Sequence, residues 1–322
     1  MRGSDTVSSN TFDRDQWAVI LGGSSGFGLA TARALGERGM SLCVVHRDRR
    51  SVAKQVEPLF DEIRASGAKL VSFNVDALSA EKRSDVLDQL ASEVGEKGRV
   101  RVLLHSIAFG NLKLLVPEVA RAEDPLAALA SRVALDAGKL REAVDELFAG
   151  GAAHTHTLAS PPLYSDKHFL DEDDFARTIH SMGTSLLGWV QELHRRQLFA
   201  EDARVFGLTS EGNTMAWKGY AAVSAAKTAL EALSRSIAVE YAPYGVRCNI
   251  IQAGITETPA LEAIPGSAQM KAQARLRNPL GRLTTPRDVA NMIYLLSRDE
   301  AAWVNGAIIR VDGGEHVSGA SG

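Results

Sequence analysis

The chain has 322 residues, 45% of them hydrophobic and 23% charged, which is enough to bury the core of one large domain or two small ones. The 36 Lys and Arg against 39 Asp and Glu leave a formal net charge of −3, so the composition offers no basic surface for nucleic acid or an anionic membrane. No apolar run reaches 18 residues, the start of the chain has no signal-peptide core, and the two cysteines, Cys43 and Cys248, lie in apolar runs typical of buried strands. We therefore expect a cytoplasmic protein with no disulfide, no membrane span and no nucleic-acid partner.

From residue 17 onward, short β-rich runs alternate with amphipathic helical runs. We expect strands at 17–22, 41–46, 69–75, 99–108, 204–210, 246–251 and 307–314, and helices at 28–39, 51–67, 80–98, 171–199, 220–241 and 286–297. Strands that are apolar throughout are covered on both faces, and right-handed crossovers join them in parallel. The pattern predicts an α/β fold with a doubly wound parallel sheet of about seven strands and helices on both faces.

One segment interrupts this alternation. Residues 111–168 are far more than a compact connection needs, and within them 124–151 has good helix formers, an Asp-Pro start and a Gly-Gly stop. We expect a single domain over residues 15–315 with a helical insertion at about 111–168, a disordered start (1–14) and a flexible end (316–322). The insertion could be a lid, an oligomer contact, a carrier-protein platform or extra packed surface.

A glycine-rich turn joins the first strand to the first helix. Gly22, Gly26 and Gly28 form the pattern G-x-x-x-G-x-G. Glycine permits positive φ and a close approach to a pyrophosphate, and the helix N-terminus supplies free N–H groups. An ordinary βα turn is the alternative, but the strand and helix on either side favour a dinucleotide site. We assign to it Gly22, Ser24, Ser25, Gly26, Phe27 and Gly28.

The end of the second strand bears on the choice of dinucleotide. A carboxylate there binds the ribose 2′-hydroxyl of NAD, whereas arginine accommodates the 2′-phosphate of NADP. The sequence at 46–50 is His-Arg-Asp-Arg-Arg. We therefore favour NADPH, with NADH possible, and choose Arg47 as the phosphate ligand because its guanidinium presents a fork of donors. A solvated basic loop is the alternative.

Tyr220 and Lys227 are the candidate reacting groups. A separation of seven residues returns to the same helix face, so both side chains can reach one site, with Val223 between them. A nearby ammonium is expected to lower the pKa of a phenol from about 10 and favour proton donation. Ser210 ends the preceding strand, and the C-terminal ends of parallel strands converge on the ligand.

These motifs together resemble the short-chain dehydrogenase/reductase family, over about residues 16–114 and 165–315. Two features resemble its enoyl-acyl-carrier-protein reductase branch: the Tyr-x6-Lys spacing and the His-Ser-Ile-Ala-Phe run at 105–109. The resemblance implies a Rossmann-type fold, a homotetramer or homodimer, and an acyl thioester on acyl carrier protein or coenzyme A, in fatty-acid or polyketide synthesis. Separately, His154 and His156 lie two residues apart with no cysteine or nearby carboxylate, so we expect no metal site.

The resemblance also implies roles for individual residues. Tyr220 would stabilise the enolate of a trans-2-enoyl thioester, Lys227 would hold the nicotinamide ribose, and Ser210 would complete the catalytic group. The further cofactor contacts would be Asn74, Val75, Ser106, Ile107, Ala108, Gly254, Ile255, Thr256 and Thr258, and the substrate contacts Phe109, Trp217 and Tyr220. Trp217 could equally pack in the core, and residues 261–277 are predicted to be a mobile substrate loop.

The position of Tyr220 suits an enoyl substrate. The hydride goes to C3 while charge develops on the oxygen of C1, so the acid must lie farther from the hydride donor than it does for a ketone. Three residues along a helix move a side chain by about 4.5 Å. Two rival hypotheses remain: a carbonyl (3-oxoacyl) reductase, which Ser210 would suit, and a non-catalytic NADP-binding sensor or scaffold, in which Val223 marks a lost site.

Overall fold

The computed structural model describes residues 11–119, 124–165 and 167–319. In this part of the chain, seven strands form one fully parallel sheet in the order β3-β2-β1-β4-β5-β6-β7. The strands are β1 (Gln16–Leu21), β2 (Ser41–His46), β3 (Leu70–Asn74), β4 (Arg99–His105), β5 (Phe199–Thr209), β6 (Val246–Ala253) and β7 (Ile308–Val311). The predicted doubly wound parallel sheet is confirmed, with its order reversing between β1 and β4.

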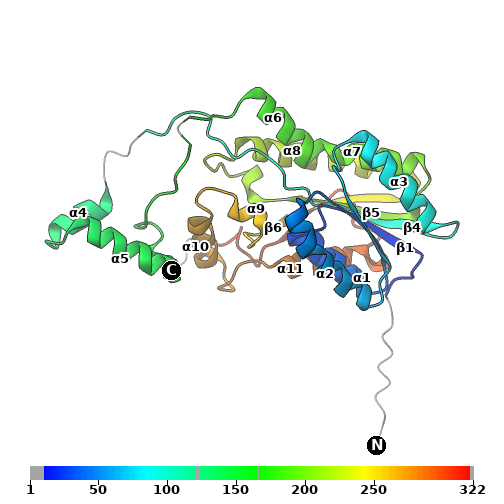
Figure 1. Cartoon of the computed structure of the whole chain (residues 1–322), viewed down its shortest axis with the longest axis horizontal. Helices are drawn as coiled ribbons and strands as arrows, with labels where there is room; N and C mark the ends of the chain where they lie inside the picture. Colours follow the sequence, from blue (N-terminus) through cyan, green and yellow to red (C-terminus); the bar gives the residue numbers. More distant parts are fainter. Residues whose placement is uncertain (1–10, 120–123, 166, 320–322) are drawn as a thin grey trace, which may run out of the picture.

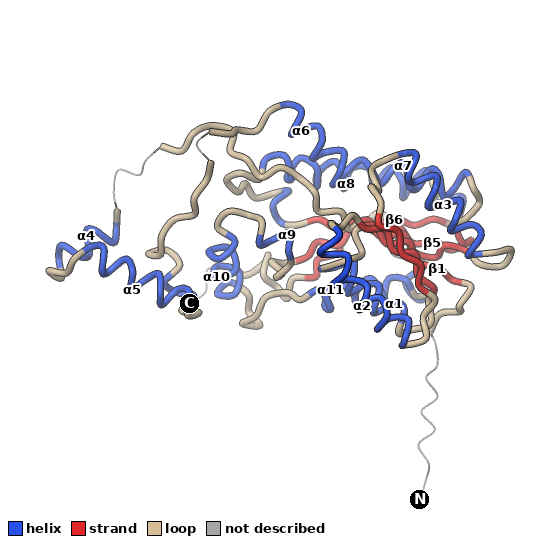
Figure 2. The backbone as a smooth tube through the Cα atoms, in the orientation of Figure 1, coloured by secondary structure: helices blue, strands red, loops and turns tan. Residues whose placement is uncertain are grey.

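Helices cover both faces of the sheet (Figure 1, Figure 2). One face carries α3 (Ala80–Val94), α6 (Glu172–Ile179), α7 (Ser185–Arg195) and α8 (Ala221–Glu240), and the other carries α1 (Gly26–Gly36), α2 (Arg50–Ala65) and α11 (Pro286–Ser297). Alternate residues of β1 enter the two cores: Val19 and Leu21 pack with α3 and α7, whereas Ala18 and Ile20 pack with α1 and α11. Both faces of the sheet are therefore shielded from water, which explains why the strands are apolar throughout.

The largest differences from the sequence prediction lie in three segments. The predicted helix 171–199 is divided by a π-helical turn at His180–Thr184, and β5 begins at Phe199, five residues before the predicted start at 204. Residues 199–203 have no apolar alternation, and it is the pairing of Phe199 with Val100 that makes them a strand. The segment predicted to be a mobile loop forms α9 (Pro259–Glu262) and α10 (Ser267–Arg277).

The folded part of the chain begins earlier than residue 15. Phe12 is 5% exposed, and its ring packs edge-on against Tyr294 with 5.9 Å between the centroids. The hydroxyl of Ser41 donates to the carbonyl of Arg14 at 2.7 Å. Residues 11–14 are thus packed against the domain, contrary to the expected disorder, while 1–10 and 320–322 lie outside the described residues.

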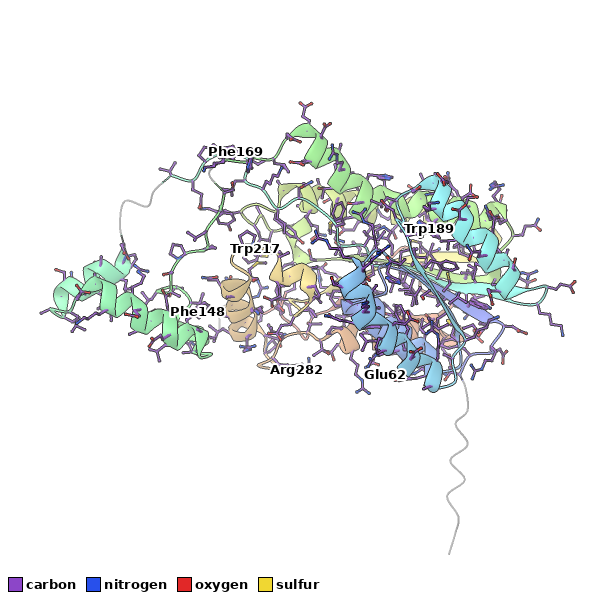
Figure 3. The ribbon with its side chains drawn as sticks, in the orientation of Figure 1. Glu62, Phe148, Phe169, Trp189, Trp217 and Arg282 are labelled. Atoms are coloured by element: carbon purple, nitrogen blue, oxygen red, sulfur yellow. The ribbon has the colours of Figure 1, made fainter. Side chains whose placement is uncertain are left out.

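The insertion carries the expected helices, α4 (Pro125–Arg132) and α5 (Ala137–Ala149), which form a hairpin standing apart from the sheet (Figure 1). The hairpin has a small core of Leu126, Val144 and Ala159, to which Phe148 adds its ring; Figure 3 shows Phe148 far from Trp189 in the main core. Its return segment reaches α10, because Gln269 donates to the carbonyl of Ser160 at 3.0 Å. None of the described helices is long and apolar enough to cross a membrane.

A buried ionic cluster holds the sheet at the edge opposite the C-terminal strand ends. Asp202 of β5 accepts from Arg101 at 2.8 Å and also contacts Arg204 and Arg247. The side chains of Arg101 and Arg204 are 5% and 0% exposed, and both also donate to main-chain carbonyls near the end of α11. One carboxylate thus joins β4, β5 and β6.

Replacing Asp202 by alanine is expected to lower the free energy of unfolding by about 3 kcal/mol, because buried guanidinium groups lose their shared counter-ion. Denaturant titration measures the change. Asp299→Ala is the matched control: this carboxylate also binds Arg101, at 2.7 Å, but its side chain is 88% exposed. We expect it to cost under about 1 kcal/mol. Equal losses in the two variants would contradict a special role for Asp202.

Candidate active site

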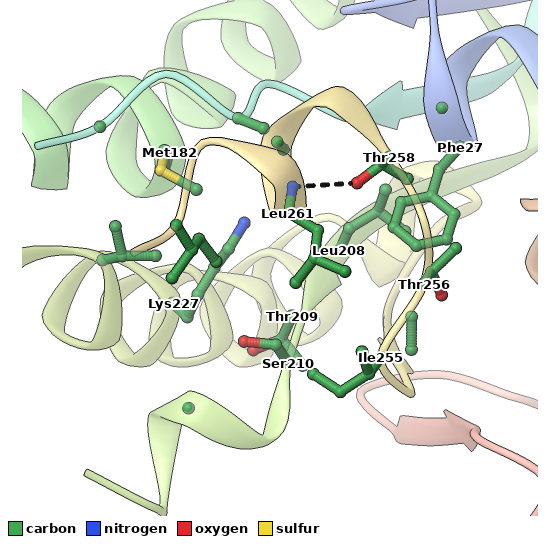
Figure 4. A pocket seen from close by; sticks show the side chains of 18 of the residues that line it. Phe27, Met182, Leu208, Thr209, Ser210, Lys227, Ile255, Thr256, Thr258 and Leu261 are labelled. Atoms are coloured by element: carbon green, nitrogen blue, oxygen red, sulfur yellow. Dashed lines mark hydrogen bonds between the residues drawn. The ribbon is translucent and has the colours of Figure 1, made fainter. Parts of the chain in front are cut away.

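A cleft opens at the C-terminal ends of the strands, where β1, β4, β5 and β6 meet α8, α9 and α10 (Figure 4). Most of the predicted site residues line it: Gly22, Ser25, Gly26, Phe27, Ser106, Ile107, Ala108, Ser210, Trp217, Tyr220, Lys227, Gly254, Ile255, Thr256 and Thr258. The others lie outside this lining: Ser24, Gly28, Arg47, Asn74, Val75 and Phe109. The strand ends therefore bring together segments that are up to 236 residues apart, from Gly22 to Thr258.

The glycine-rich turn is shaped for close backbone approach. Gly22 has φ +81°, and a Cβ there would lie 2.5 Å from the carbonyl oxygen of Ser106. A Cβ at Gly28 would collide with the carbonyl oxygen of Gly22. Ser25 makes no side-chain cap at the N-terminus of α1, so the first N–H groups of that helix remain open to an anion. This cradle fits the pyrophosphate of a dinucleotide.

Arg47, Asn74 and Phe109 gather beyond the ends of β2, β3 and β4. Asn74 exchanges two hydrogen bonds with the backbone of Asp48, at 2.9 and 3.0 Å. The guanidinium of Arg47 pairs with Asp76 at 2.9 Å and lies 5.1 Å above the ring of Phe109. Phe109, 59% exposed, therefore lies beside Arg47 and is not among the lining residues, although its neighbours Ala108 and Gly110 are. Its contact with substrate stays a prediction.

Tyr220 stands directly before the first turn of α8, as its N-cap residue. Its hydroxyl is 3.3 Å from the hydroxyl of Ser210. The ring passes so close to Gly212 that a Cβ there would lie 2.5 Å from Cε1, so glycine at 212 is a condition for this ring position. Ser210 and Tyr220, predicted to act together, are thus in contact.

The pKa of Tyr220 differs in direction from the sequence expectation. Burial raises this pKa above its usual 10, and the hydrogen bond with Ser210 opposes the rise only in part. Lys227 is not among the groups that shift this pKa, so the expected lowering by its ammonium does not occur. Tyr220 is therefore a protonated hydrogen-bond donor at neutral pH.

Lys227 is buried, with 7% of its surface exposed, and reaches from α8 toward the middle of the cleft (Figure 4). Burial lowers its pKa to about 8, while the carboxylate of Glu231, one turn further along α8, acts in the opposite direction. The pKa of His105 is lowered to about 3, mainly by burial and secondly by the Lys227 ammonium. His105 is therefore neutral beside Lys227. The floor of the cleft thus holds a single ammonium with a nearby carboxylate.

Val223 belongs to an apolar wall of the cleft. It is 3% exposed and packs with Met182 and Ala226. Gly110 lies against this wall, since a Cβ there would come within 2.8 Å of the sulfur of Met182 and 3.3 Å of Val223. Val223 therefore places no hydroxyl four residues before Lys227. Among the residues that line the cleft, Tyr220 has the only phenol.

The sequence interpretation did not identify several lining residues: Gly110, Leu112, Met182 and Glu211. Leu261, Ile264 and Met270 also line the cleft, and they belong to the segment that was predicted to be a substrate loop. Glu211 directly follows Ser210, so the strand-end rule could have found it. Leu261 and Ile264 enter the cleft because Thr258 caps α9, accepting from the N–H of Leu261 at 3.2 Å (Figure 4). Met182 lies in the π-helical turn, for which the sequence has no recognised signal.

An α/β sheet with an anion cradle after β1, and with a phenol and an ammonium at the same strand edge, defines a dinucleotide-dependent oxidoreductase. Comparison with known families agrees. A model described as short chain dehydrogenase matches residues 16–116, and one described as enoyl-(acyl carrier protein) reductase matches residues 151–316. The chain belongs to the short-chain dehydrogenase/reductase family, whose members bind NAD(P)H.

Curated relatives cover nearly the whole chain. It is 29% identical over 297 residues to cis-4-hydroxycyclohexanecarboxylate dehydrogenase of Sinomonas cyclohexanicum, covering 92% of this chain and 95% of that protein. It is 27% identical over 308 residues to a Bacillus subtilis protein described as "Probable 2,4-dienoyl-CoA reductase", covering 93% and 96%.

Solved structures show the same fold. FabI of Candidatus Liberibacter asiaticus superposes with a TM-score of 0.71 at 19% identity, covering 95% of this chain and 97% of that one. The NADH-dependent enoyl-[acyl-carrier-protein] reductase of Aquifex aeolicus gives a TM-score of 0.68 at 21% identity, covering 95% and 98%. At this level of identity the likeness concerns the fold.

Proposed function

We propose that the protein reduces the C2=C3 double bond of a trans-2-enoyl thioester with NADPH. The observation that carries this proposal is the placement of Tyr220: its hydroxyl enters the cleft seven residues before Lys227, while the nearer position is taken by the packed side chain of Val223. A phenol set farther along the cleft suits a substrate whose charge develops on an oxygen three bonds away from the carbon that receives the hydride.

Different residues of the cleft have different roles in this reaction. A bound NADPH would supply the hydride for C3, and the C2=C3 electron pair would move toward the thioester carbonyl. The Tyr220 hydroxyl donates to the oxygen on C1, where negative charge accumulates, and a burial-raised pKa keeps that hydroxyl protonated. A proton from solvent water would then add to C2 and give the saturated thioester. Trp217, Leu261 and Met270 keep water from the apolar chain.

The cofactor would be held by groups already in place. The turn at Gly22–Gly28 would bind the pyrophosphate, and Lys227 would donate to the nicotinamide ribose. Thr256 and Thr258, at the end of β6, would contact the carboxamide and phosphates. Arg47, with 57% of its side chain exposed, would bind the 2′-phosphate that distinguishes NADPH from NADH.

Replacing Arg47 by alanine is expected to raise the Kd for NADPH by about tenfold and leave the Kd for NADH nearly unchanged, because one charge-assisted contact to the 2′-phosphate is lost. Fluorescence titration of both cofactors measures the change. Arg195→Ala, on the surface of α7 where Arg195 pairs with Glu192, is the matched control. Equal weakening of both cofactors would contradict a 2′-phosphate site at Arg47.

Carbonyl reduction is the second candidate. The 3.3 Å approach of Ser210 to Tyr220 would suit a ketone, and one relative is named for dehydrogenation of a cyclohexane alcohol. Incubation with NADPH and a 2-enoyl thioester, then with a 3-oxoacyl thioester and a cyclohexanone, separates the candidates. Oxidation of NADPH with the first substrate alone supports our proposal, and oxidation with the others alone overturns it. Binding of NADPH without any turnover would indicate a sensor or scaffold.

We further propose a homotetramer or homodimer in the cytoplasm, acting on acyl carrier protein or coenzyme A thioesters. The exposed edge strand β7 and its surroundings support association, since Leu295, Trp303 and Ile308 are 51%, 97% and 43% exposed. Cys43 and Cys248 are buried free thiols, as suits a reducing compartment. Sedimentation velocity measures the assembly, and a monomer at micromolar concentration would overturn it.

A further inference from the structure

Arg277, the last residue of α10, is bound by two buried carboxylates. Its Nη2 atom donates to both oxygens of Glu211 at 2.7 Å and to Oε1 of Glu315 at 2.9 Å. The side chains of Glu211 and Glu315 are 9% and 2% exposed, and that of Arg277 is 17% exposed. Burying a charged carboxylate is costly unless a cation pairs with it. The three side chains therefore hold one another in position.

The cluster, which we call the Arg277 cluster and define as Glu211, Arg277 and Glu315, joins three segments that border the cleft. Glu211 follows Ser210 at the end of β5 and lines the cleft itself. Glu315 lies beyond β7, and its Oε2 accepts from the main-chain N–H of Ile255 at 3.3 Å. Arg277 ends the helix pair α9–α10.

The backbone at the end of β6 is adapted to this contact. A Cβ at Gly254 would lie 2.8 Å from Oε2 of Glu315, so only glycine lets the carboxylate approach Ile255. Gly254 and Ile255 both line the cleft. The cluster therefore sets the backbone on one side of the cleft as well as the helix on the other.

Two polar side chains connect the end of α10 to the segments that follow the strands: Arg277 and its C-cap residue Asn278, which donates to the carbonyl of Asp312 at 2.8 Å. Leu261, Ile264 and Met270 face the cleft, and the tie at the start of α10 runs to the insertion, through Gln269 and Ser160. At its far end, Arg277 supplies the bridge to β5. Breaking that bridge would free the apolar wall made by α9–α10 without touching the residues of the dinucleotide cradle.

We propose that Arg277 is a positioning residue which, through Glu211 and Glu315, holds α9–α10 over the cleft and thereby forms the substrate side of the site. It acts through the helix pair rather than by touching the reacting atoms. Because Glu315 also contacts the backbone at Ile255, a predicted cofactor contact, we expect substrate affinity to fall more than cofactor affinity. This inference requires only that the cleft is the active site, whichever thioester or carbonyl compound is reduced.

The test uses Arg277→Gln combined with Glu211→Gln, which removes one positive and one negative charge and so keeps the net charge. We expect amide hydrogen exchange in residues 259–277 to accelerate by about tenfold, since the local opening of α9–α10 loses a charge-assisted contact. KM for the reducible substrate should rise by about tenfold while kcat falls less and the Kd for NADPH stays within about twofold. Arg275→Gln, exposed on the same helix, is the matched control and should leave all values unchanged.

Unchanged exchange in 259–277, or a Kd for NADPH that rises as much as KM, would overturn the proposal. Because exchange needs no substrate, this readout stays valid if enoyl reduction itself is disproved. Should the double variant not fold, Arg277→Lys takes its place: it keeps the charge but not the reach of the guanidinium, and exchange in 259–277 must then accelerate by about threefold. Where both fold, KM of Arg277→Lys should lie between those of the wild type and the double variant.

Discussion

Tyr220→Phe is expected to lower kcat by about 10²- to 10⁴-fold, because the oxygen that gains charge during hydride addition loses its hydrogen-bond and proton donor. The ring, its contact with Gly212 and the apolar wall are retained. The Kd for NADPH should therefore stay within about twofold of the wild type. Stopped-flow NADPH oxidation and fluorescence titration provide the two measurements.

Tyr244→Phe is the matched control for this variant. Tyr244 is 60% exposed and lies at the far end of α8, in the turn before β6, so the same deletion of a phenolic oxygen should leave turnover unchanged. A Tyr220→Phe variant that turns over substrate at the wild-type rate would remove Tyr220 from the mechanism. Loss of NADPH binding in the same variant would show that the main role of Tyr220 is to bind the cofactor.

Lys227 is expected to impose the alkaline limit on activity. Its ammonium is the form that donates to the ribose, and burial lowers its pKa to about 8. Below that pH the group is charged and active, and above it kcat/KM should fall by about tenfold per pH unit as the proton is lost. Lys227→Met should lose about 10²-fold or more in kcat/KM at pH 7. The pH profile of kcat/KM measures the position of the limit.

Glu231→Gln provides the control for that assignment. The carboxylate of Glu231 raises the pKa of Lys227 against the effect of burial, so its neutral amide should move the alkaline limit to lower pH. The amide oxygen of glutamine can still accept from Thr209 and Asn213, as the carboxylate does. An alkaline limit that stays at the same pH in Glu231→Gln would show that another group is titrating.

Part of the site was predictable from local sequence because several of its residues come directly after predicted strands. The turn at Gly22–Gly28 and the pair Tyr220 and Lys227 follow apolar runs whose periodicity fixes where each strand stops. In a parallel sheet those stops meet at one edge. Glu211 could have been included on the same reasoning, as the next residue after Ser210.

Other site features depend on contacts between distant segments. Phe109, predicted as a substrate contact, lies 5.1 Å from the guanidinium of Arg47, a contact between the segments that follow β4 and β2. The pKa of Tyr220 was expected to fall, yet it rises, because neighbouring segments bury the hydroxyl and the hydrogen bond with Ser210 offsets that effect only in part. The Arg277 cluster joins residues 211, 277 and 315, whose spacing contains no local signal.

By itself the sequence determined the parallel α/β sheet, the dinucleotide turn and the seven-residue spacing of Tyr220 and Lys227, because each follows from hydrophobic periodicity and helix geometry over a short stretch. Only the tertiary structure decided how deeply those groups are buried, which helix pair covers them and which charges face one another. Burial and ion pairing depend on contacts between segments that are distant in the sequence, and these contacts form only when the chain folds.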